Sequence, residues 1–131
     1  MVQEGKSILI VDDSETNLVL LEAVLKDKGW VIQTAGSAVL AMKIINVSKP
    51  DLILLDLLMP GIDGQEMLKR LKSDDRFRHI PVIIVSAIAD NKIRNECLEK
   101  GAVYYMPKPV KIQPLLEVIQ NTFDVSSNDC L

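Results

Sequence analysis

The polar residues that could do chemistry in this chain each follow a short apolar run. They are Asp12 and Asp13, Asp56, Ser86 and Lys108, and they come after the runs 8–11, 52–55, 82–85 and 103–106. Each run has the length and the aliphatic content of a buried parallel strand. Because the carboxyl ends of parallel strands share one edge of an open α/β sheet, these side chains should converge on one crevice.

This set of three carboxylates, one hydroxyl and one amine suits a single task. One carboxylate would accept a phosphoryl group beside a divalent cation. Adjoining carboxylates repel each other, which should raise the pKa of at least one of them and is tolerable with a cation present. Mg²⁺ binds one or two carboxylates and keeps several waters. Asp13 and Asp56 can therefore supply the carboxylates, with Asp12 close by or acting through water. Asp56 is the natural nucleophile, with Lys108 and Ser86 as donors to phosphoryl oxygens.

Taken singly, each of these residues has a simpler explanation. Asp12 and Asp13 could be an acidic pair at a helix N-terminus, where carboxylates are favourable. Asp56 could be a turn residue, Ser86 a helix cap and Lys108 a surface lysine. These separate explanations do not account for the fact that every one of these residues follows a predicted strand. They also do not account for the position of Lys108 between two prolines, which restrict its backbone. Together the residues favour one functional site.

The chain alternates apolar runs with amphipathic stretches, which indicates βα units around a parallel sheet. Strands are expected at 7–11, 31–35, 52–55, after Pro81 and at 103–106, and helices at 15–28, after Ser37, around Met67 to Leu71, at 91–100 and through Leu115 to about Phe123. A turn is expected at 59–64. We predict a single doubly wound (βα)5 domain with a flavodoxin-like five-stranded parallel sheet in the order 2-1-3-4-5. Its expected limits are 6–123, with a flexible polar tail at 124–131.

The composition of the chain narrows the class of protein further. The chain has 131 residues, enough for one domain, and with 48% hydrophobic but only 4% aromatic residues its core must be aliphatic. The net charge is −3 and no Lys/Arg stripe forms, which argues against nucleic-acid binding. Cys97 and Cys130 lack CxxC partners and predict free thiols. No run resembles a signal peptide or a membrane span, so a cytoplasmic protein without a membrane partner is expected.

The motifs strongly resemble the CheY-like receiver domain of two-component response regulators. The matching residues are Ile10-Val11-Asp12-Asp13, Leu54-Leu55-Asp56-Leu57-Leu58-Met59-Pro60-Gly61, Asp63-Gly64, Pro81-Val82-Ile83, Ser86-Ala87 and Lys108-Pro109. The resemblance covers nearly the whole chain. It implies a signalling switch of a phosphorelay, not an enzyme, that assists its own phosphotransfer and its slow autodephosphorylation.

The resemblance also implies residue roles. Asp56 would accept the phosphoryl group from a sensor histidine kinase or a histidine phosphotransfer protein. Asp12 and Asp13, with Asp56 and the backbone carbonyl of Leu58, would organise Mg²⁺. Lys108 would contact the phosphoryl group, and the Lys108-Pro109 peptide is often cis in this family.

The output also follows from the resemblance. Ser86 and Tyr105 would be the switch pair, and the face formed by the helix at 91–100, the strand at 103–106 and the last helix would bind a partner, an output domain or a second copy. Tyr105 would rotate inward on phosphorylation. Leu58 and Ile88 flank the path of the hydrolytic water by analogy, and because both are bulky and apolar, self-dephosphorylation should be slow.

Two other classes use related folds. A haloacid-dehalogenase-type phosphatase also has an Asp nucleophile after a parallel strand, but its Asp-x-Asp motif would need a second Asp where Leu58 stands. A flavodoxin-type electron carrier needs a phosphate loop rich in hydroxyls and glycine, whereas the acidic stretch 11–15 would repel a phosphate. Steady turnover of a phosphomonoester or a bound flavin would support these alternatives.

Overall fold

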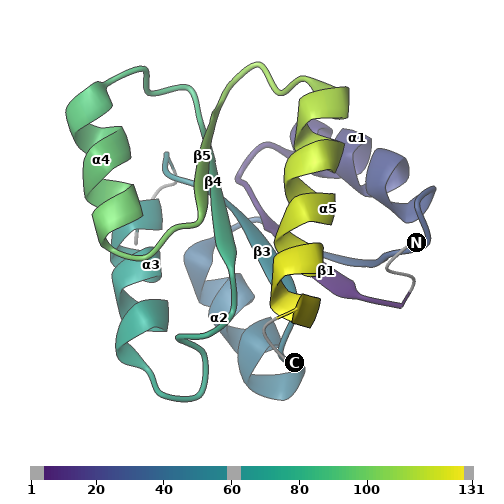
Figure 1. Cartoon of the computed structure of the whole chain (residues 1–131), viewed down its shortest axis with the longest axis horizontal. Coiled ribbons are helices and arrows are strands. Elements are labelled where there is room, and N and C mark those ends of the chain that lie inside the picture. The colour runs from purple at the N-terminus through teal and green to yellow at the C-terminus, as the bar shows by residue number, and fades with distance from the viewer. Residues whose placement is uncertain (1–4, 59–62, 129–131) are drawn as a thin grey trace.

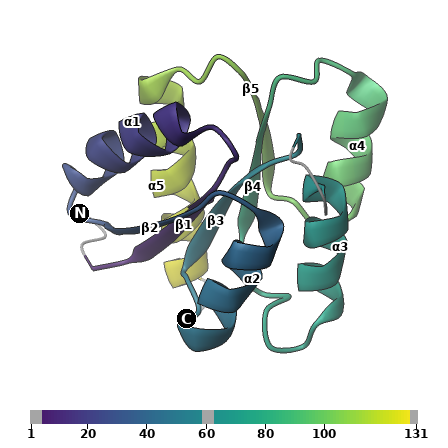
Figure 2. The ribbon, with the colours of Figure 1, turned by 180° about the vertical axis from the view of Figure 1, so that it is seen from behind.

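The computed structural model of the chain describes residues 5–58 and 63–128. Five parallel strands form one sheet in the order β2-β1-β3-β4-β5, as predicted. The strands are β1 (Ser7–Val11), β2 (Val31–Ala35), β3 (Leu52–Asp56), β4 (Val82–Ser86) and β5 (Tyr104–Pro107), and the helices are α1 (Glu15–Lys26), α2 (Ala38–Val47), α3 (Gly64–Ser73), α4 (Asn91–Glu99) and α5 (Ile112–Asn128). Helices α1 and α5 cover one face of the sheet, and α2, α3 and α4 cover the other (Figures 1 and 2).

Alternate residues of each strand feed two separate aliphatic cores, because successive side chains of a strand point to opposite faces. Ile8 and Ile10 of β1 pack with Leu21 and Leu25 of α1, on the face that α5 also covers. Leu9 packs on the opposite face with α2, α3 and α4. The inner strands β1, β3 and β4 are therefore buried on both faces, which explains their apolar runs.

Side-chain caps set where the helices begin. The hydroxyls of Ser14 and Ser37 accept the backbone N–H of the third residue on, at the start of α1 and α2. The carboxylates of Asp63 and Asp90 do the same for α3 and α4. These residue types are strong N-caps because their oxygens satisfy N–H groups that lack a helical acceptor. Each cap follows the loop that leaves the carboxyl end of a strand.

Strand register brings the expected site residues together. Val11 of β1 lies opposite Leu55 of β3, so Asp12 and Asp56 emerge side by side. At the other end of the site, Ser86 of β4 lies opposite Pro107 of β5. Gly64 opens α3 directly against the end of β3, where a Cβ atom would lie 2.6 Å from the Cα of Leu57. Only a glycine permits this approach, so the position of α3 depends on it.

Several boundaries differ from the sequence-based expectation. Helix α1 ends at Lys26 rather than at residue 28, and β5 begins at Tyr104. Helix α5 continues to Asn128, so the first residues of the expected tail are helical. No glycine or proline follows Phe123 in this stretch, and the helix therefore has no stop signal there. Residues 59–62 of the expected turn, and 129–131 of the expected tail, lie outside the described residues.

Three further features concern the rest of the chain. Cys97 is a buried free thiol, and Cys130 lies outside the described residues. Trp30, just before β2, is buried and packs edge-on against Phe123 of α5, with ring centroids 5.8 Å apart. In the described ranges no helix is long and apolar enough to cross a membrane, and the cytoplasmic location stays a prediction.

Candidate functional site

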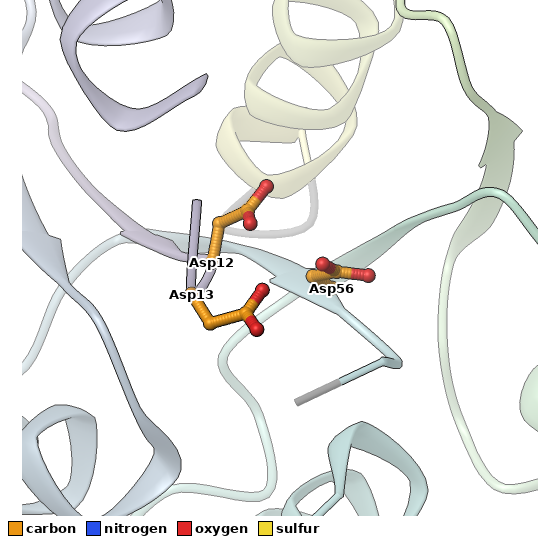
Figure 3. Close-up of side chains that lie close together, drawn as sticks. All are labelled: Asp12, Asp13 and Asp56. Atoms are coloured by element: carbon orange, nitrogen blue, oxygen red, sulfur yellow. The ribbon is translucent and has the colours of Figure 1, made fainter. Parts of the chain in front are cut away.

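Three carboxylates meet at the carboxyl edge of the sheet, as the sequence predicted. Oxygens of Asp12, Asp13 and Asp56 all lie within 4.8 Å of one another (Figure 3). Asp12 and Asp56 are only 3% and 4% exposed, whereas Asp13 faces solvent. This arrangement combines two buried carboxylates with one that water can reach.

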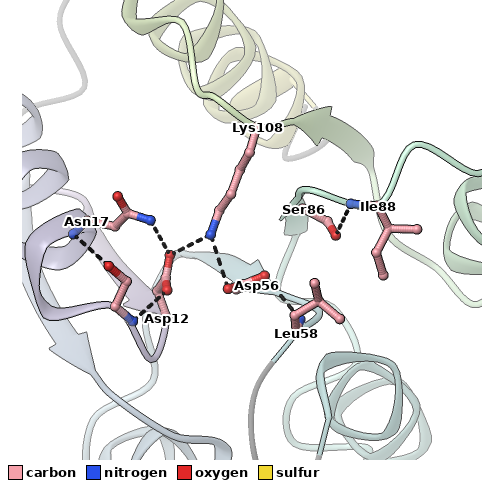
Figure 4. Close-up of polar contacts among 8 residues, drawn as sticks. Asp12, Asn17, Asp56, Leu58, Ser86, Ile88 and Lys108 are labelled. Carbon is pink, nitrogen blue, oxygen red and sulfur yellow. Dashed lines mark hydrogen bonds and ion pairs between the residues drawn. The ribbon is translucent and has the colours of Figure 1, made fainter.

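Lys108 joins the two buried carboxylates. Its Nζ lies 3.1 Å from Oδ2 of Asp12 and 3.1 Å from Oδ2 of Asp56 (Figure 4). The backbone N–H of Lys108 donates to the carbonyl of Ser86 at 2.9 Å, which fixes the loop after β5 against the end of β4. The Lys108-Pro109 peptide is cis, as the resemblance implied. One ammonium therefore serves as counter-ion to two carboxylates from different strands.

Burial governs the electrostatics of the site. Burial raises the pKa of Asp56 above its ordinary value, although hydrogen bonds from the Leu58 N–H and Lys108 oppose the rise, and the charge of Asp12 adds a smaller upward contribution. Burial acts to lower the pKa of Lys108, but its bonds to Asp12 and Asp56 outweigh burial and the pKa is raised. The expected upward shift of one carboxylate is thus present, but desolvation and not like-charge repulsion is its main cause.

Asp12 is held by more partners than the sequence suggested. Its Oδ1 accepts the backbone N–H of Ser14 at 2.9 Å, and its Oδ2 accepts Nδ2 of Asn17 at 3.4 Å. Asn17 was not among the predicted site residues. Its place in the first turn of α1, five residues after Asp12, is the signal that could have found it, because that turn lies directly above the end of β1.

Ser86 and Tyr105 both bind the peptide groups of Ile88. The buried hydroxyl of Ser86 accepts the Ile88 N–H at 3.1 Å, and the Tyr105 hydroxyl donates to the Ile88 carbonyl at 2.7 Å. The Tyr105 ring is half-buried and packs against the core beneath α2, α3 and α4, while Tyr104 is exposed, as strand alternation predicts. The two expected switch residues are thus linked through one residue of the loop after β4.

Leu58 and Ile88 lie on one side of the three carboxylates, towards the end of β4. The Leu58 N–H donates to Oδ1 of Asp56 at 3.1 Å, and its side chain is exposed. Ile88 is half-buried against the core. Figure 4 shows both side chains on the far side of Asp56 from Asp12. The roles predicted for them, and for the Leu58 carbonyl, remain predictions.

Known proteins resemble this chain along almost its whole length. The model of the response regulator receiver domain matches residues 8–120. The polar-differentiation response regulator DivK of Brucella anthropi is 34% identical over 116 residues, covering 88% of this chain and 94% of DivK. The response regulator PleD of Caulobacter vibrioides is 41% identical over 103 residues, 79% of this chain. The chain spans only 23% of the length of PleD.

Solved structures agree with these sequence relatives. A CheY-like receiver domain protein from Methanospirillum hungatei is 28% identical, with a TM-score of 0.90 over 96% of this chain and 99% of that chain. A response regulator from Chloroflexus aurantiacus is 32% identical, with a TM-score of 0.85 over 90% of this chain and 97% of that chain. The chain belongs to the response regulator receiver domain family, the signalling switches of two-component systems. This assignment leaves the phosphatase alternative without support.

Proposed function

We propose that Asp56 is the phosphoacceptor of this receiver domain. The observation that carries the proposal is the pairing of Asp56 with Lys108 at 3.1 Å inside a cluster of three carboxylates at the carboxyl edge of the sheet. A carboxylate oxygen of Asp56 would form the new bond to phosphorus as the bond to the donor histidine nitrogen breaks. Lys108 would then contact the phosphoryl oxygens, and the Ser86 hydroxyl would donate to one of them.

The donor set fits Mg²⁺. Carboxylate oxygens are the hard ligands that this ion prefers, and the exposure of Asp13 allows the ion to keep several waters. Asp12, Asp13 and Asp56, with the backbone carbonyl of Leu58, would hold it. When bound, the ion would supply positive charge to the phosphoryl oxygens, which is most of what phosphoryl transfer requires from a protein.

The phosphoryl donor would be a histidine kinase or a histidine phosphotransfer protein. A groove of about 560 Å³ opens beside Lys108, between α1 and the loop that precedes α5, with Leu20 and Ile112 among its lining residues. Both side chains, and Val19 next to Leu20, are exposed although they are apolar. Exposed apolar side chains beside a polar site are typical of protein docking surfaces, so this side of the site suits a protein donor.

The output would pass through Ser86 and Tyr105. Movement of the Ser86 hydroxyl to a phosphoryl oxygen would remove the acceptor of the Ile88 N–H, and Tyr105 holds the carbonyl of the same residue. The loop after β4 and the face formed by α4, β5 and α5 would then change together. This face would bind a partner, an output domain or a second copy. The domain thus acts as a switch whose own chemistry is limited to phosphotransfer and slow autodephosphorylation.

Mass spectrometry of the intact protein tests the acceptor directly. Acetyl phosphate with Mg²⁺ should add one phosphoryl group to the wild-type chain, and Asp56→Asn should remove the adduct because the amide is a poor nucleophile of almost the same shape. Omitting Mg²⁺ should strongly reduce the wild-type adduct. A phosphoryl adduct that persists in Asp56→Asn would refute the assignment.

Amide chemical shifts test the output. Beryllofluoride, a mimic of the phosphoryl group, should shift resonances at Ile88, Tyr105 and α4 as well as at Asp56. The same titration of Asp56→Asn should leave the spectrum unchanged. Shifts confined to the immediate surroundings of Asp56 would contradict the proposed route.

A further inference from the structure

Asp12 is fixed by donors on both of its carboxylate oxygens. Oδ1 is bound by the Ser14 N–H at 2.9 Å. Oδ2 is shared between Nζ of Lys108 at 3.1 Å and Nδ2 of Asn17 at 3.4 Å. Figure 4 shows the two donors approaching this oxygen from different sides. The shorter contact belongs to Lys108, so Asn17 is the weaker partner in this state.

The ammonium of Lys108 is shared between two carboxylates, because its Nζ also lies 3.1 Å from Oδ2 of Asp56. The proposed function requires Lys108 to turn towards a phosphoryl group on Asp56. Oδ2 of Asp12 would then lose its closer donor. The described residues offer one other donor to this oxygen, the amide of Asn17. If Oδ2 lost both of its donors, the buried Asp12 carboxylate would keep only the Ser14 N–H on Oδ1, and its orientation towards the metal site would be less well fixed.

We propose that Asn17 is a positioning residue that keeps Asp12 oriented towards the metal site when Lys108 turns to the phosphoryl group. This inference rests on the proposed function and adds a residue to it. Asn17 would act through Asp12 and would not touch the phosphoryl group. A partner that orients a metal-binding carboxylate commonly changes metal affinity when it is removed.

The local structure explains why an asparagine serves here. The backbone N–H of Asn17 donates to the Ser14 hydroxyl at 3.3 Å, which fixes the first turn of α1. Its half-buried side chain reaches back to Asp12 from that turn. Because an ionised carboxylate is only an acceptor, the NH₂ group of the amide must face it. The helix cap uses the backbone and the contact with Asp12 uses the side chain, so substitution can separate the two roles.

Asn17→Leu tests the inference, because leucine has a similar size, favours the helix more than asparagine does, and has no donor. Calorimetric titration should show a Mg²⁺ dissociation constant raised about three- to tenfold, the size expected for one net hydrogen bond. Mg²⁺ with beryllofluoride should raise the melting temperature of Asn17→Leu by less than it raises that of the wild type. The melting temperatures of the two ligand-free proteins should differ less than these two rises do. Asn17→Gln, which keeps the amide, should recover most of the affinity.

Asn46→Leu is the matched control. Asn46 lies on α2, where its amide donates to the Met42 carbonyl at 2.8 Å and its oxygen accepts from Arg76, away from the carboxylates. This variant should bind Mg²⁺ as the wild type does. If Asn17→Leu fails to fold, Asn17→Ala takes its place in the same comparison.

Three outcomes would overturn the inference. Wild-type Mg²⁺ affinity and wild-type stabilisation by beryllofluoride in Asn17→Leu would show that Asp12 needs no help. A lower melting temperature with unchanged metal affinity in Asn17→Leu would show that Asn17 only stabilises α1. Equal Mg²⁺ affinity in Asn17→Gln and Asn17→Leu would show that the amide is not the cause of the effect. A wild-type chain that takes up neither Mg²⁺ nor beryllofluoride would instead refute the proposed function, which separates the two failures.

Discussion

At the amino edge of the sheet, Asp51 accepts hydrogen bonds from the backbone N–H and the hydroxyl of Ser7, whereas at the carboxyl edge Asp56 lies beside two further carboxylates. The lysines of the two edges differ in the same way: Lys72 at the amino edge binds backbone carbonyls, whereas Lys108 at the carboxyl edge binds two carboxylates. Nζ of Lys72 donates to the carbonyls of Arg78 and Ile80 at 2.9 and 2.8 Å, which ties α3 to the loop before β4.

Charged groups at the amino edge are therefore matched to nearby backbone groups that stay in place. At the carboxyl edge three carboxylates face one ammonium, and among the described residues Lys108 is the only cation paired with them. Groups of the first kind hold elements together, while groups of the second kind are balanced only when a ligand arrives. The comparison shows how one sheet separates stability from function.

The largest expected effect follows from removing one carboxylate at each edge. Asp13→Ala should raise the Mg²⁺ dissociation constant at least about tenfold, because a ligand is lost, and should raise the melting temperature of the metal-free protein by relieving repulsion. Asp51→Ala should lower the melting temperature and leave Mg²⁺ binding unchanged. Calorimetric titration and thermal unfolding check both variants. Equal Mg²⁺ affinity in Asp13→Ala and wild type would break the comparison.

The second effect concerns water beside the acceptor. Leu58 and Ile88 are apolar side chains that cannot orient a hydrolytic water, so the wild-type phosphoryl group should be long-lived. The double substitution Leu58→Asn and Ile88→Glu supplies polar groups there and should accelerate dephosphorylation at least about tenfold. Loss of the adduct after removal of acetyl phosphate can be followed by mass spectrometry. Decay of the wild type within seconds, or a double variant that is no faster, would contradict this role.

The smallest effect concerns pH. The folded chain holds a proton on Asp56 more tightly than the unfolded chain, since burial raises this pKa above 3.8. The stabilisation that this proton supplies is present below 3.8 and is lost as pH rises through the folded-state pKa. Asp56→Asn cannot ionise, so without metal it should melt higher than wild type at neutral pH, by about 2–6 °C.

This difference should shrink as the pH is lowered from neutral through the raised folded-state pKa of Asp56 towards 3.8. Thermal unfolding in a chelating buffer across this range provides the measurement. Asp51→Asn is the control from the amino edge, and it should melt below wild type at neutral pH because Ser7 loses a charged acceptor. A gap between Asp56→Asn and wild type that stays constant with pH would show that Asp56 does not titrate in this way.

The fold and the meeting of the three carboxylates could be predicted because local signals specify them. The apolar runs define strands, Ser14 and Ser37 cap the helices that follow, and the crossover rule leaves few strand orders. The contact of Lys108 with both Asp12 and Asp56 could not be predicted, since it depends on one long side chain choosing a rotamer between two strands.

Other features had a weak local signal or none. The spacing of Asn17 from Asp12 places it in the first turn of α1, but only the folded structure shows that its amide reaches Oδ2 of Asp12. The end of α5 at Asn128 was missed because polar residues after Phe123 suggested fraying, although none of them stops a helix. The main cause of the Asp56 shift was also missed, because burial of one carboxylate depends on how closely the surrounding loops pack.

Trp30 is the only tryptophan of the chain, and it lies before β2, at the opposite edge of the sheet from the carboxylates. Its indole packs against Phe123 in the part of α5 that lies at the amino edge of the sheet, away from Asp56, the loop after β4 and Tyr105. Its fluorescence should therefore report global unfolding and remain almost silent to events at Asp56. The protein carries its own optical probe of folding, so the stability of each variant described above can be measured without a label.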